Sequence, residues 1–273
     1  MENAKKVFFT VWPYILIAVL LVISFIPIVW VLMSSIKPAG DILTTPPFYF
    51  PKTVTSQHYY DIFFKSNCLP IIRNSLIIAS SATLISLFLG TMAAYVFARS
   101  KSRVLDLLLS AILTGRMMPA VALVIPLYMA VRKLGLVNTK LSLIIAYTAI
   151  CLPFAIFMMI GFIQQIPVEI EEAGIVDGCS RFKVLTNLIL PLVSPGLAST
   201  AVFSFLTGWN EYLFAVIFTL DEKSRTIPIL LMAYDTGRNT YWGPRFAVMV
   251  VSLIPATLFT LLAQKYLVAG VTL

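Results

Sequence analysis

The residue types and spacings that stand out most form an acidic, glycine-containing segment in the middle of the chain. It reads Glu-Ile-Glu-Glu-Ala-Gly-Ile-Val-Asp-Gly from Glu169 to Gly178. Pro167 ends one helix or opens the next, so the acids lie in a first helical turn, where the positive helix end favours anions. Asp177-Gly178 is a turn signal. The segment predicts a helix, a turn and a second short helix.

The segment is expected to lie across the membrane surface. Ala173 and Gly174 leave a bare surface that another backbone could approach closely. The second helix carries apolar residues at a spacing of three on one face and polar residues on the other. The apolar face comprises Phe182, Leu185 and Leu188, and the polar face Arg181, Lys183 and Asn187. The residues alone also allow a plain amphipathic surface loop.

Motifs for catalysis or nucleotide binding are missing from the sequence. It contains no Gly-Lys pair for a phosphate-cradling loop, no His-Glu-x-x-His and no Gly-x-Ser-x-Gly. The single histidine, His58, lies in a polar stretch and is expected to be solvated. Cys68, Cys151 and Cys179 are odd in number and widely spaced, so neither a metal site nor a disulfide framework is expected. Energy for any work must therefore come from a partner or from an ion gradient.

The composition indicates a membrane protein. Hydrophobic residues make up 59% of the 273 residues and charged residues only 12%, against about 25% charged in soluble domains. Folding so apolar a chain in water would expose large apolar patches. The net charge of +8 comes from scattered basic residues. This pattern is ordinary beside anionic lipid and does not favour nucleic-acid binding.

Six stretches reach the roughly 20 apolar residues of a spanning helix. The third contains Arg116, Pro119 and Pro126, so it is expected to kink and to face protein or water. The other five are expected to be continuous. The predicted spans are Tyr14–Met33, Leu76–Ala98, Leu107–Val131, Leu141–Ile163, Leu197–Leu220 and Phe246–Val268.

Several polar residues fall inside these apolar stretches. An ionisable group at such a position costs about 2.5–3.5 kcal/mol to insert. Arg116 could line a translocation path, pair with Glu211 or snorkel. Asn210 and Glu211 could line or gate the path, or form a structural hydrogen bond between helices. Trp209 and Tyr212 could stack on sugar rings, or belong to an interfacial aromatic belt.

The spacing in the acidic segment resembles the EAA loop of ABC importer permeases. That pattern reads Glu-Ala-Ala, three residues, Gly, nine residues, Ile, one residue, Leu-Pro. Here Glu172-Ala173-Gly174 is followed by Gly178, then Leu188 and Leu190-Pro191. The sequence departs from it twice, with Gly174 for the second Ala and Leu188 for Ile. Both changes preserve residue character, so the resemblance holds.

This resemblance implies a function for the segment. In that family the loop is a cytoplasmic coupling helix that docks into a cleft of the ATP-hydrolysing subunit. Residues 164–191 are then a cytoplasmic coupling loop, both termini are cytoplasmic, and residues 37–70 and 221–245 are extracytoplasmic. Glu172 is implied to pair with a basic residue of that subunit, and Gly178 to form the turn. The implied docking residues are Glu169, Glu171, Glu172, Ala173, Gly174, Asp177 and Gly178.

A second resemblance covers nearly the whole chain. Ser35-Ile36-Lys37, His58-Tyr59, Asn74-Ser75, and Trp209-Asn210-Glu211-Tyr212 are similar to segments of maltose-type carbohydrate permeases. In those permeases the loop near the last span projects toward an external sugar-binding protein. The corresponding residues here are Tyr234, Asp235, Thr236, Gly237, Arg238 and Asn239.

Together these observations predict an all-α polytopic membrane protein with six spans, one permease domain over residues 1–273 and a core at about residues 71–268. The resemblance implies a non-catalytic permease subunit of a sugar importer in the inner membrane of a prokaryote. It implies alternating access with a second homologous permease, two ATPase subunits and an external binding protein. The chain itself is expected to bind no cofactor or metal, with ATP and Mg on the partners. A permease for a polyol or glycerol phosphoester, or an ion-coupled transporter with Glu211 as its ion site, remains an alternative.

Overall fold

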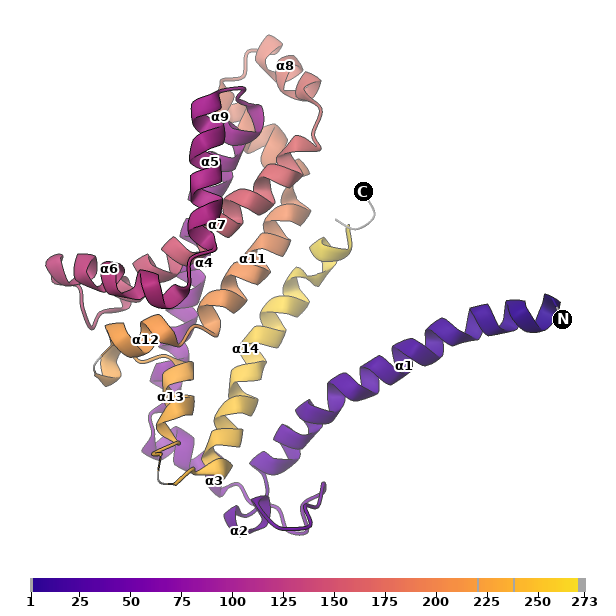
Figure 1. Cartoon of the computed structure of the whole chain (residues 1–273), viewed down its shortest axis with the longest axis vertical. Coiled ribbons are helices and arrows are strands. Elements are labelled where there is room, and N and C mark those ends of the chain that lie inside the picture. The colour runs from indigo at the N-terminus through magenta and orange to yellow at the C-terminus, as the bar shows by residue number, and fades with distance from the viewer. Residues whose placement is uncertain (1, 220, 238, 270–273) are drawn as a thin grey trace. The chain divides into compact units, whose positions relative to one another are not determined.

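The structure is a computed structural model that describes residues 2–219, 221–237 and 239–269. The side chains of residues 2–10, 222 and 265–269 lie outside this description. Helices and connecting loops make up the described chain, as predicted, apart from one antiparallel bridge between Asp235 and Thr240 (Figure 1).

The helices include four short turns of special geometry. Residues Asp61–Lys65 and Leu185–Ile189 form π-helices, Glu222–Ser224 forms a 3-10 helix, and Leu190–Leu192 is a single α-turn, α10. The remaining helices are α1 Glu2–Ser35, α2 Ala39–Ile42, α3 Gln57–Tyr60, α4 Cys68–Arg99, α5 Arg103–Arg116, α6 Ala120–Lys133, α7 Lys140–Gln164, α8 Val168–Val176, α9 Arg181–Val184, α11 Ser194–Trp209, α12 Leu213–Phe218, α13 Ile227–Ala233 and α14 Trp242–Ala269.

Four of these helices are long and apolar enough to cross a bilayer over their described lengths, namely α1, α4, α7 and α14. Two further pairs reach the same length and composition but are bent at a short break. These are α5 with α6, bent by 105°, and the segment Arg181–Leu192 with α11, bent by 79°. Six spans result if each bent pair counts as one, in agreement with the predicted number.

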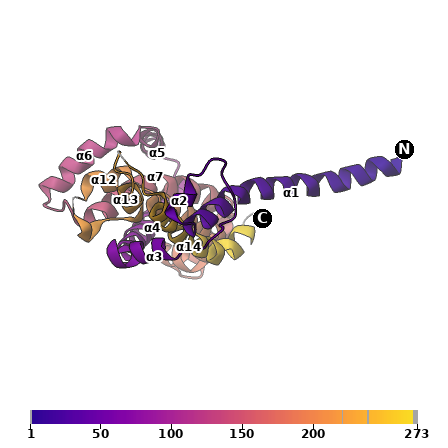
Figure 2. The ribbon, with the colours of Figure 1, turned by 90° about the horizontal axis from the view of Figure 1, so that it is seen from below.

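The third predicted span breaks between α5 and α6, where Pro119 precedes the first residue of α6. Proline has no amide hydrogen and disfavours helical geometry at the residue before it, here Met118. Figure 2 shows α5 and α6 running in different directions, with α12 beside α6. The expected kink is therefore a bend of 105° between two separate helices.

The fifth predicted span is not one continuous helix, which corrects the expectation for Leu197–Leu220. α11 ends at Trp209, and α12 begins only at Leu213. The Glu211 carboxylate accepts hydrogen bonds from the amides of Leu213 and Phe214, both at 3.0 Å. A carboxylate that binds the first free amides of a helix stabilises a new helix start at this point. Leu220 lies outside the described residues.

The chain divides into two compact units. The first contains residues Met1–Cys68 and Leu231–Ser252, and the second Leu69–Leu230 and Leu253–Leu273. Two buried clusters lie among the described residues of the second unit. One joins α4, α6, α7 and α12 around Tyr147 and Phe214. The other joins the ends of α4 and α7 to residues 184–193 and includes Met159, Ile163 and Val184.

His58, in the first unit, corrects another expectation. Its side chain is buried rather than solvated. Its Nε2 lies 2.8 Å from the Lys37 carbonyl oxygen, which can only accept, so Nε2 carries the hydrogen. The ring also packs on Gly243, where a Cβ atom would lie 2.1 Å from the ring. The polar residues around His58 in sequence concealed this burial, because it depends on α14.

Lys37 is buried in the same unit. Its ammonium donates to the Phe48 carbonyl and lies 4.5 Å from the Trp30 ring centroid and 5.0 Å from that of Phe48. Burial lowers the pKa of Lys37, and Asp41 opposes this effect. The segment after α1 is thus an ordered structure held by Lys37.

Candidate functional site

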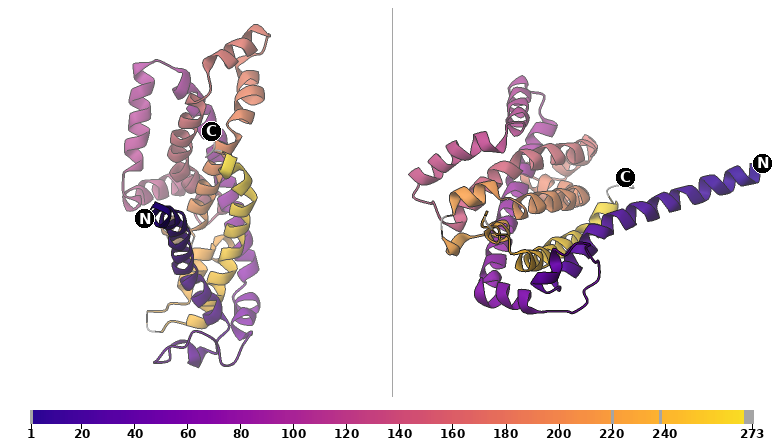
Figure 3. Two further views of the ribbon diagram at one scale, coloured as in Figure 1. Left: turned by 90° about the vertical axis from the view of Figure 1, so that its right-hand side faces the viewer. Right: turned by 60° about the horizontal axis from the view of Figure 1, so that its bottom comes forward.

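The acidic segment forms the predicted helix–turn–helix. α8 follows Pro167, and Gly178 forms the turn in the left-handed region, at φ +87°. The Cys179 amide donates to the Gly174 carbonyl at 2.9 Å, and the Ser180 hydroxyl caps α9 by accepting from the Lys183 amide. Figure 3 shows this hairpin at one end of the second unit. We call residues 167–184 the docking hairpin.

Five of the seven predicted docking residues lie on the exposed surface of the docking hairpin. These are Glu169, Glu172, Ala173, Asp177 and Gly178. Glu171 and Gly174 are buried, so neither of them faces a partner. The acids of the segment that stay exposed are Glu169, Glu172 and Asp177.

Glu171 instead joins the hairpin to α4. Its Oε1 accepts from Arg99 Nε at 2.7 Å, and its Oε2 accepts from the Tyr95 hydroxyl at 2.9 Å. Arg99 Nη2 also donates to the Ile166 carbonyl at 2.8 Å. A buried carboxylate requires such partners, because desolvating an unpaired charge is costly. Both lone-pair edges of Glu171 are therefore used within the chain.

Gly174 faces the second half of the hairpin. A Cβ atom built there would lie 2.6 Å from Leu188 Cδ1 and 3.4 Å from Val184 Cγ2. The close approach predicted at Gly174 is thus made by Leu188 and Val184 of the same chain. It allows α8 to pack on the residues that follow α9.

The apolar face of the second helix also differs from the prediction. Phe182 is exposed, while Val184, Leu185 and Ile189 are buried. The cause is the π-helix Leu185–Ile189, whose wider turn shifts the side chains away from the three-residue spacing.

Sequence reasoning missed several residues at this site. Ile175 and Val176 are apolar and lie exposed at the tip, Val176 with 86% of its surface accessible. Two adjacent apolar residues between Gly174 and a turn were the available signal. Nothing in the sequence indicated that Tyr95 and Arg99 bind Glu171.

The residues from Trp209 to Tyr212 serve mainly internal contacts. Trp209 is buried and stacks on Phe205, with ring centroids 5.6 Å apart. The Asn210 side chain donates to the Leu206 carbonyl at 2.9 Å. Glu211 caps α12, and Tyr212 is partly exposed. The structure does not place these residues in one cavity with Arg116.

Arg116 lies at a separate cavity of about 680 Å³ within the second unit. Its guanidinium carbon lies 4.7 Å from the Phe154 ring centroid, and Phe154 contacts Phe203 edge to face at 5.7 Å. Ser204 and Thr207 also line the cavity, and the remaining lining residues are apolar. Sequence reasoning named only Arg116 among these, since the others come from α7 and α11.

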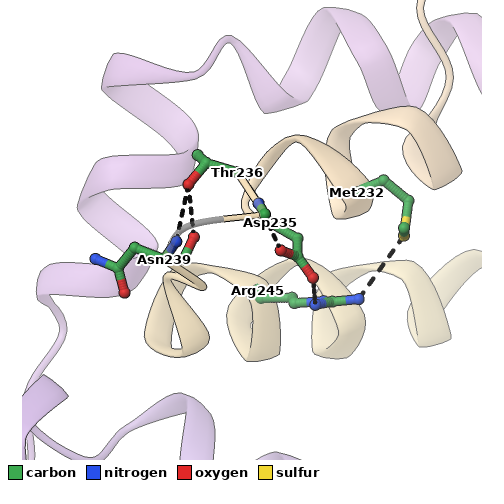
Figure 4. Close-up of polar contacts among 6 residues, drawn as sticks. Met232, Asp235, Thr236, Asn239 and Arg245 are labelled. Carbon is green, nitrogen blue, oxygen red and sulfur yellow. Dashed lines mark hydrogen bonds and ion pairs between the residues drawn. The ribbon is translucent and has the colours of Figure 1, made fainter.

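The predicted binding-protein loop is an ordered hairpin, shown in Figure 4. The Thr236 hydroxyl donates to the Asn239 carbonyl at 2.8 Å, and the Gly237 amide donates to Asp235 Oδ1 at 3.1 Å. Arg245 Nη1 lies 3.2 Å from Asp235 Oδ2. The Tyr234 hydroxyl pairs with the Ser66 hydroxyl at 2.7 Å. Arg238 lies outside the described residues.

The pKa values of Asp235 and Tyr234 in this loop are shifted in opposite directions. The Gly237 amide, and more weakly Arg245, hold the pKa of the Asp235 carboxyl below its usual range. Burial raises the pKa of Tyr234. The ionised form of Asp235 is therefore favoured, and Asp235, Thr236, Gly237 and Asn239 are exposed to another molecule.

Comparison with known proteins agrees with these features. Residues 86–273 match the family described as "Binding-protein-dependent transport system inner membrane component". The diacetylchitobiose uptake system permease protein DasC of Streptomyces coelicolor is 31% identical over 98% of this chain and 97% of its own length. The trehalose/maltose transport system permease protein MalG of Thermococcus litoralis is 34% identical over 92% of this chain and 91% of its own.

A solved structure shares the fold. A chain of a bacterial ABC transporter involved in the import of the acidic polysaccharide alginate superposes with a TM-score of 0.81 at 19% identity, over 96% of this chain and 98% of that one. The family match covers more than half of the sequence, and the relatives align along nearly all of it. This chain therefore belongs to the inner-membrane components of binding-protein-dependent transport systems.

Proposed function

We propose that this chain is one of two permease subunits of an ATP-driven importer for carbohydrates. A second, homologous permease completes the translocation path, and two ATP-hydrolysing subunits supply the energy. An external binding protein delivers the sugar. Closure of the ATPase subunits moves the docking hairpin, and the spans then open on one side of the membrane and close on the other.

The observation that carries this proposal is the construction of the docking hairpin. Its surface presents Glu172 beside the exposed apolar pair Ile175 and Val176. Its base is fixed to α4 through Glu171 and Arg99. An exposed acidic and apolar tip on a rigid support is suited to bind a second protein and to transmit that protein's movement.

The orientation of the chain in the membrane and its lack of a catalytic role follow from the same proposal. The hairpin faces the cytoplasm, both termini are cytoplasmic, and residues 37–70 and 221–245 face outward. Residues 1–273 form one permease domain with its core at about 71–268. The chain has no catalytic residue and no cofactor of its own, and ATP and Mg bind the partner subunits. The ordered loop at Asp235 contacts the binding protein.

Two kinds of evidence support a carbohydrate substrate. Relatives named for diacetylchitobiose and for trehalose and maltose align along almost the entire chain. The cavity at Arg116 combines aromatic rings with few polar groups, as small-molecule sites do. A polyol or glycerol phosphoester would leave the hairpin unchanged. The ion-coupled alternative loses its basis, because Glu211 is engaged with the amides that begin α12.

The test is purification of the membrane complex through this chain, in wild type and in Glu172→Lys. We expect an ATP-hydrolysing subunit and a second permease to copurify with wild type. Glu172→Lys places a cation at an exposed position where the proposal requires an anion. ATPase activity stimulated by binding protein should then fall at least tenfold, while the fold is kept.

Asp106→Lys is the matched control, because Asp106 is an exposed acid in the first turn of α5, outside the hairpin. It should retain wild-type coupling. A wild-type chain that purifies alone under mild detergent, or a Glu172→Lys complex that remains fully coupled, would refute the proposal.

A further inference from the structure

The cavity at Arg116 is a second feature of the second unit, separate from the docking hairpin. It is formed by residues of α5, α6, α7, α11 and α12, all in the second unit, and measures about 680 Å³. Pockets of about 300–1,000 Å³ hold small organic ligands. The lining is largely apolar, so the few polar groups determine which ligand fits.

Arg116 is the charged residue of this lining. A guanidinium is always protonated in proteins and presents a planar fork of donors. Here it lies over the Phe154 ring, and no carboxylate of the described residues forms an ion pair with it. The Arg116 side chain is exposed at this largely apolar lining, where its guanidinium is available to bind an anionic partner.

Ser204 provides an independent indication that a ligand binds. Its side chain is only 2% exposed, and its hydroxyl is one of the buried polar atoms without a hydrogen-bond partner in the described structure. Buried hydroxyl groups are normally satisfied. The neighbouring Thr207 hydroxyl donates to the Phe203 carbonyl of its own helix at 2.7 Å, so it does not need a ligand. Ser204 is thus a residue of the cavity lining whose hydroxyl is unpaired and itself buried.

Phe154 and Phe203 complete the site. Their rings pack edge to face at an angle of 74°. Arg116 lies over the Phe154 ring, and Phe203 precedes Ser204 in the sequence. Aromatic faces pack against the apolar face of a sugar ring, as they do against other flat apolar surfaces. The cavity thus combines a cation, an aromatic wall and a free hydroxyl.

From these observations we propose that the cavity binds an acidic sugar, with the sugar's carboxylate or sulfonate held by Arg116. The pyranose ring lies against Phe154 and Phe203, and a ring oxygen or hydroxyl binds Ser204. This inference rests on the proposed transport function and specifies the substrate class of the same path. A neutral sugar would leave the cation of Arg116 without an anion.

The experiment uses the complex purified through this chain and placed in phosphatidylcholine nanodiscs. Thr207→Cys introduces a thiol at an exposed position of the cavity wall. The background carries Cys179→Ser and Cys151→Ala, because Cys151 also lines the cavity, and it keeps the buried Cys68 of this chain. The rate of maleimide labelling is measured with digalacturonate as the acidic probe and with maltose as the neutral probe. Size-exclusion profiles verify that each variant complex is intact.

We expect digalacturonate to slow labelling and maltose to have little effect at the same concentration. Arg116→Gln should raise the half-protecting concentration of digalacturonate about tenfold or more, since it removes a charge-assisted bidentate contact. Arg116→Lys should give an intermediate value, and Ser204→Ala a rise of a few-fold. Arg132→Gln, which removes an exposed arginine of α6 outside the cavity lining, should have no effect.

Several results would overturn the inference. These are equal protection by maltose, no protection by digalacturonate, or protection that survives Arg116→Gln. A thiol that does not react at all would also overturn it, because a cavity closed to maleimide is closed to a sugar. Labelling could also be slower in phosphatidylglycerol nanodiscs than in phosphatidylcholine nanodiscs, with no further protection by digalacturonate. That result would show that Arg116 binds a lipid headgroup instead.

The same preparation separates this inference from the proposed function. If the ATPase subunit copurifies and Glu172→Lys uncouples it, while digalacturonate gives no protection, only the acidic-sugar inference fails. If no ATPase subunit is present, the importer proposal fails, and the labelling still reports whether the cavity binds an acidic sugar.

Discussion

Arg99 Nε lies 2.7 Å from Glu171 Oε1, across 72 residues of sequence, and this ion pair joins the end of α4 to the docking hairpin. Both side chains are largely buried, at 16% and 7% exposed. The Tyr95 hydroxyl and the Ile166 carbonyl complete the cluster. Force applied to the hairpin therefore reaches a spanning helix directly through side chains, in addition to the backbone of α7.

Removing one partner of this pair should uncouple transport from ATP hydrolysis. Glu171→Ala or Arg99→Ala leaves a buried charge alone, which costs about 3–5 kcal/mol. The double variant should be less destabilised than the sum of the two, because it leaves no unpaired charge. Thermal unfolding in detergent measures the stability, and sugar taken up per ATP hydrolysed measures the coupling.

The exposed pair Lys65–Asp61 provides the control. Its nitrogen and oxygen are also 2.7 Å apart, but the lysine side chain is 64% exposed. Lys65→Ala should change stability by about 0.5 kcal/mol or less and leave coupling intact. Additive effects at Arg99 and Glu171, or normal coupling in both single variants, would contradict a role for their pairing.

Substitutions of Gly174 by side chains of increasing size should have increasing effects on the docking hairpin. A Cβ atom there meets the flexible end of Leu188, so Gly174→Ala requires only a small shift of that side chain. Because alanine also favours a helix by about 1 kcal/mol over glycine, we expect a nearly neutral effect. Gly174→Ile should separate the two halves of the hairpin and abolish assembly with the ATPase subunit. A fully assembled Gly174→Ile complex would show that this packing is dispensable.

Glu211 should behave as a helix cap. Glu211→Ala removes the acceptor for the amides of Leu213 and Phe214, and loss of a cap costs about 0.5–2 kcal/mol. Glu211→Gln keeps one oxygen and should lose less. Both variants should lower the melting temperature without changing the sugar-to-ATP ratio. Uptake that becomes insensitive to an uncoupler only in these variants would instead assign Glu211 to an ion site.

The loop at Asp235 should remain ordered over the physiological pH range. Its folded pKa lies below the ordinary aspartate value, so the ionised form stabilises the loop above about pH 3.9. This contribution is lost only as the pH falls through the lower, folded pKa. Hydrogen exchange at the Thr236, Gly237 and Asn239 amides should therefore be equally protected at pH 5 and pH 7, after correction for intrinsic rates.

Variants of Asp235 separate charge from geometry. Asp235→Asn retains an acceptor for the Gly237 amide but loses the attraction to Arg245, whereas Asp235→Ala loses both contacts. Exchange should rise moderately in the first and strongly in the second, with stimulation by binding protein falling in the same order. Equal exchange in all three proteins would mean that the hydrogen bonds of Thr236 hold the loop alone.

The fold was largely predictable because its signals are local. Apolar runs of sufficient length mark α1, α4, α7 and α14, and the turn at Asp177-Gly178 follows from residue type. The break at Asn210–Tyr212 was hidden because hydropathy averages over a window and does not register one acid that caps a helix. The π-helix after α9 was equally invisible, because its shift of side-chain direction depends on packing against α7.

The functional residues were predictable only where a motif carries them. The spacing from Glu172 to Pro191 located the hairpin, but not which of its acids faces outward. Glu171 and Glu172 are adjacent in sequence and differ in burial only because Arg99 and Tyr95 lie beneath one of them. The cavity at Arg116 combines residues of α5, α6, α7, α11 and α12, and such a combination has no signature along the chain.

The anchoring of the docking hairpin also bears on how it could be imitated. A synthetic peptide of residues 167–184 would contain every exposed contact residue but would lack Arg99 and Tyr95, as well as the cluster around Met159 and Ile163. Fixing each residue of such a peptide costs about 1–2 kcal/mol of conformational entropy, which the intact subunit has already overcome on folding. Free peptides should therefore be poor competitors, and a stapled or grafted form that supplies the missing support should be a much better one.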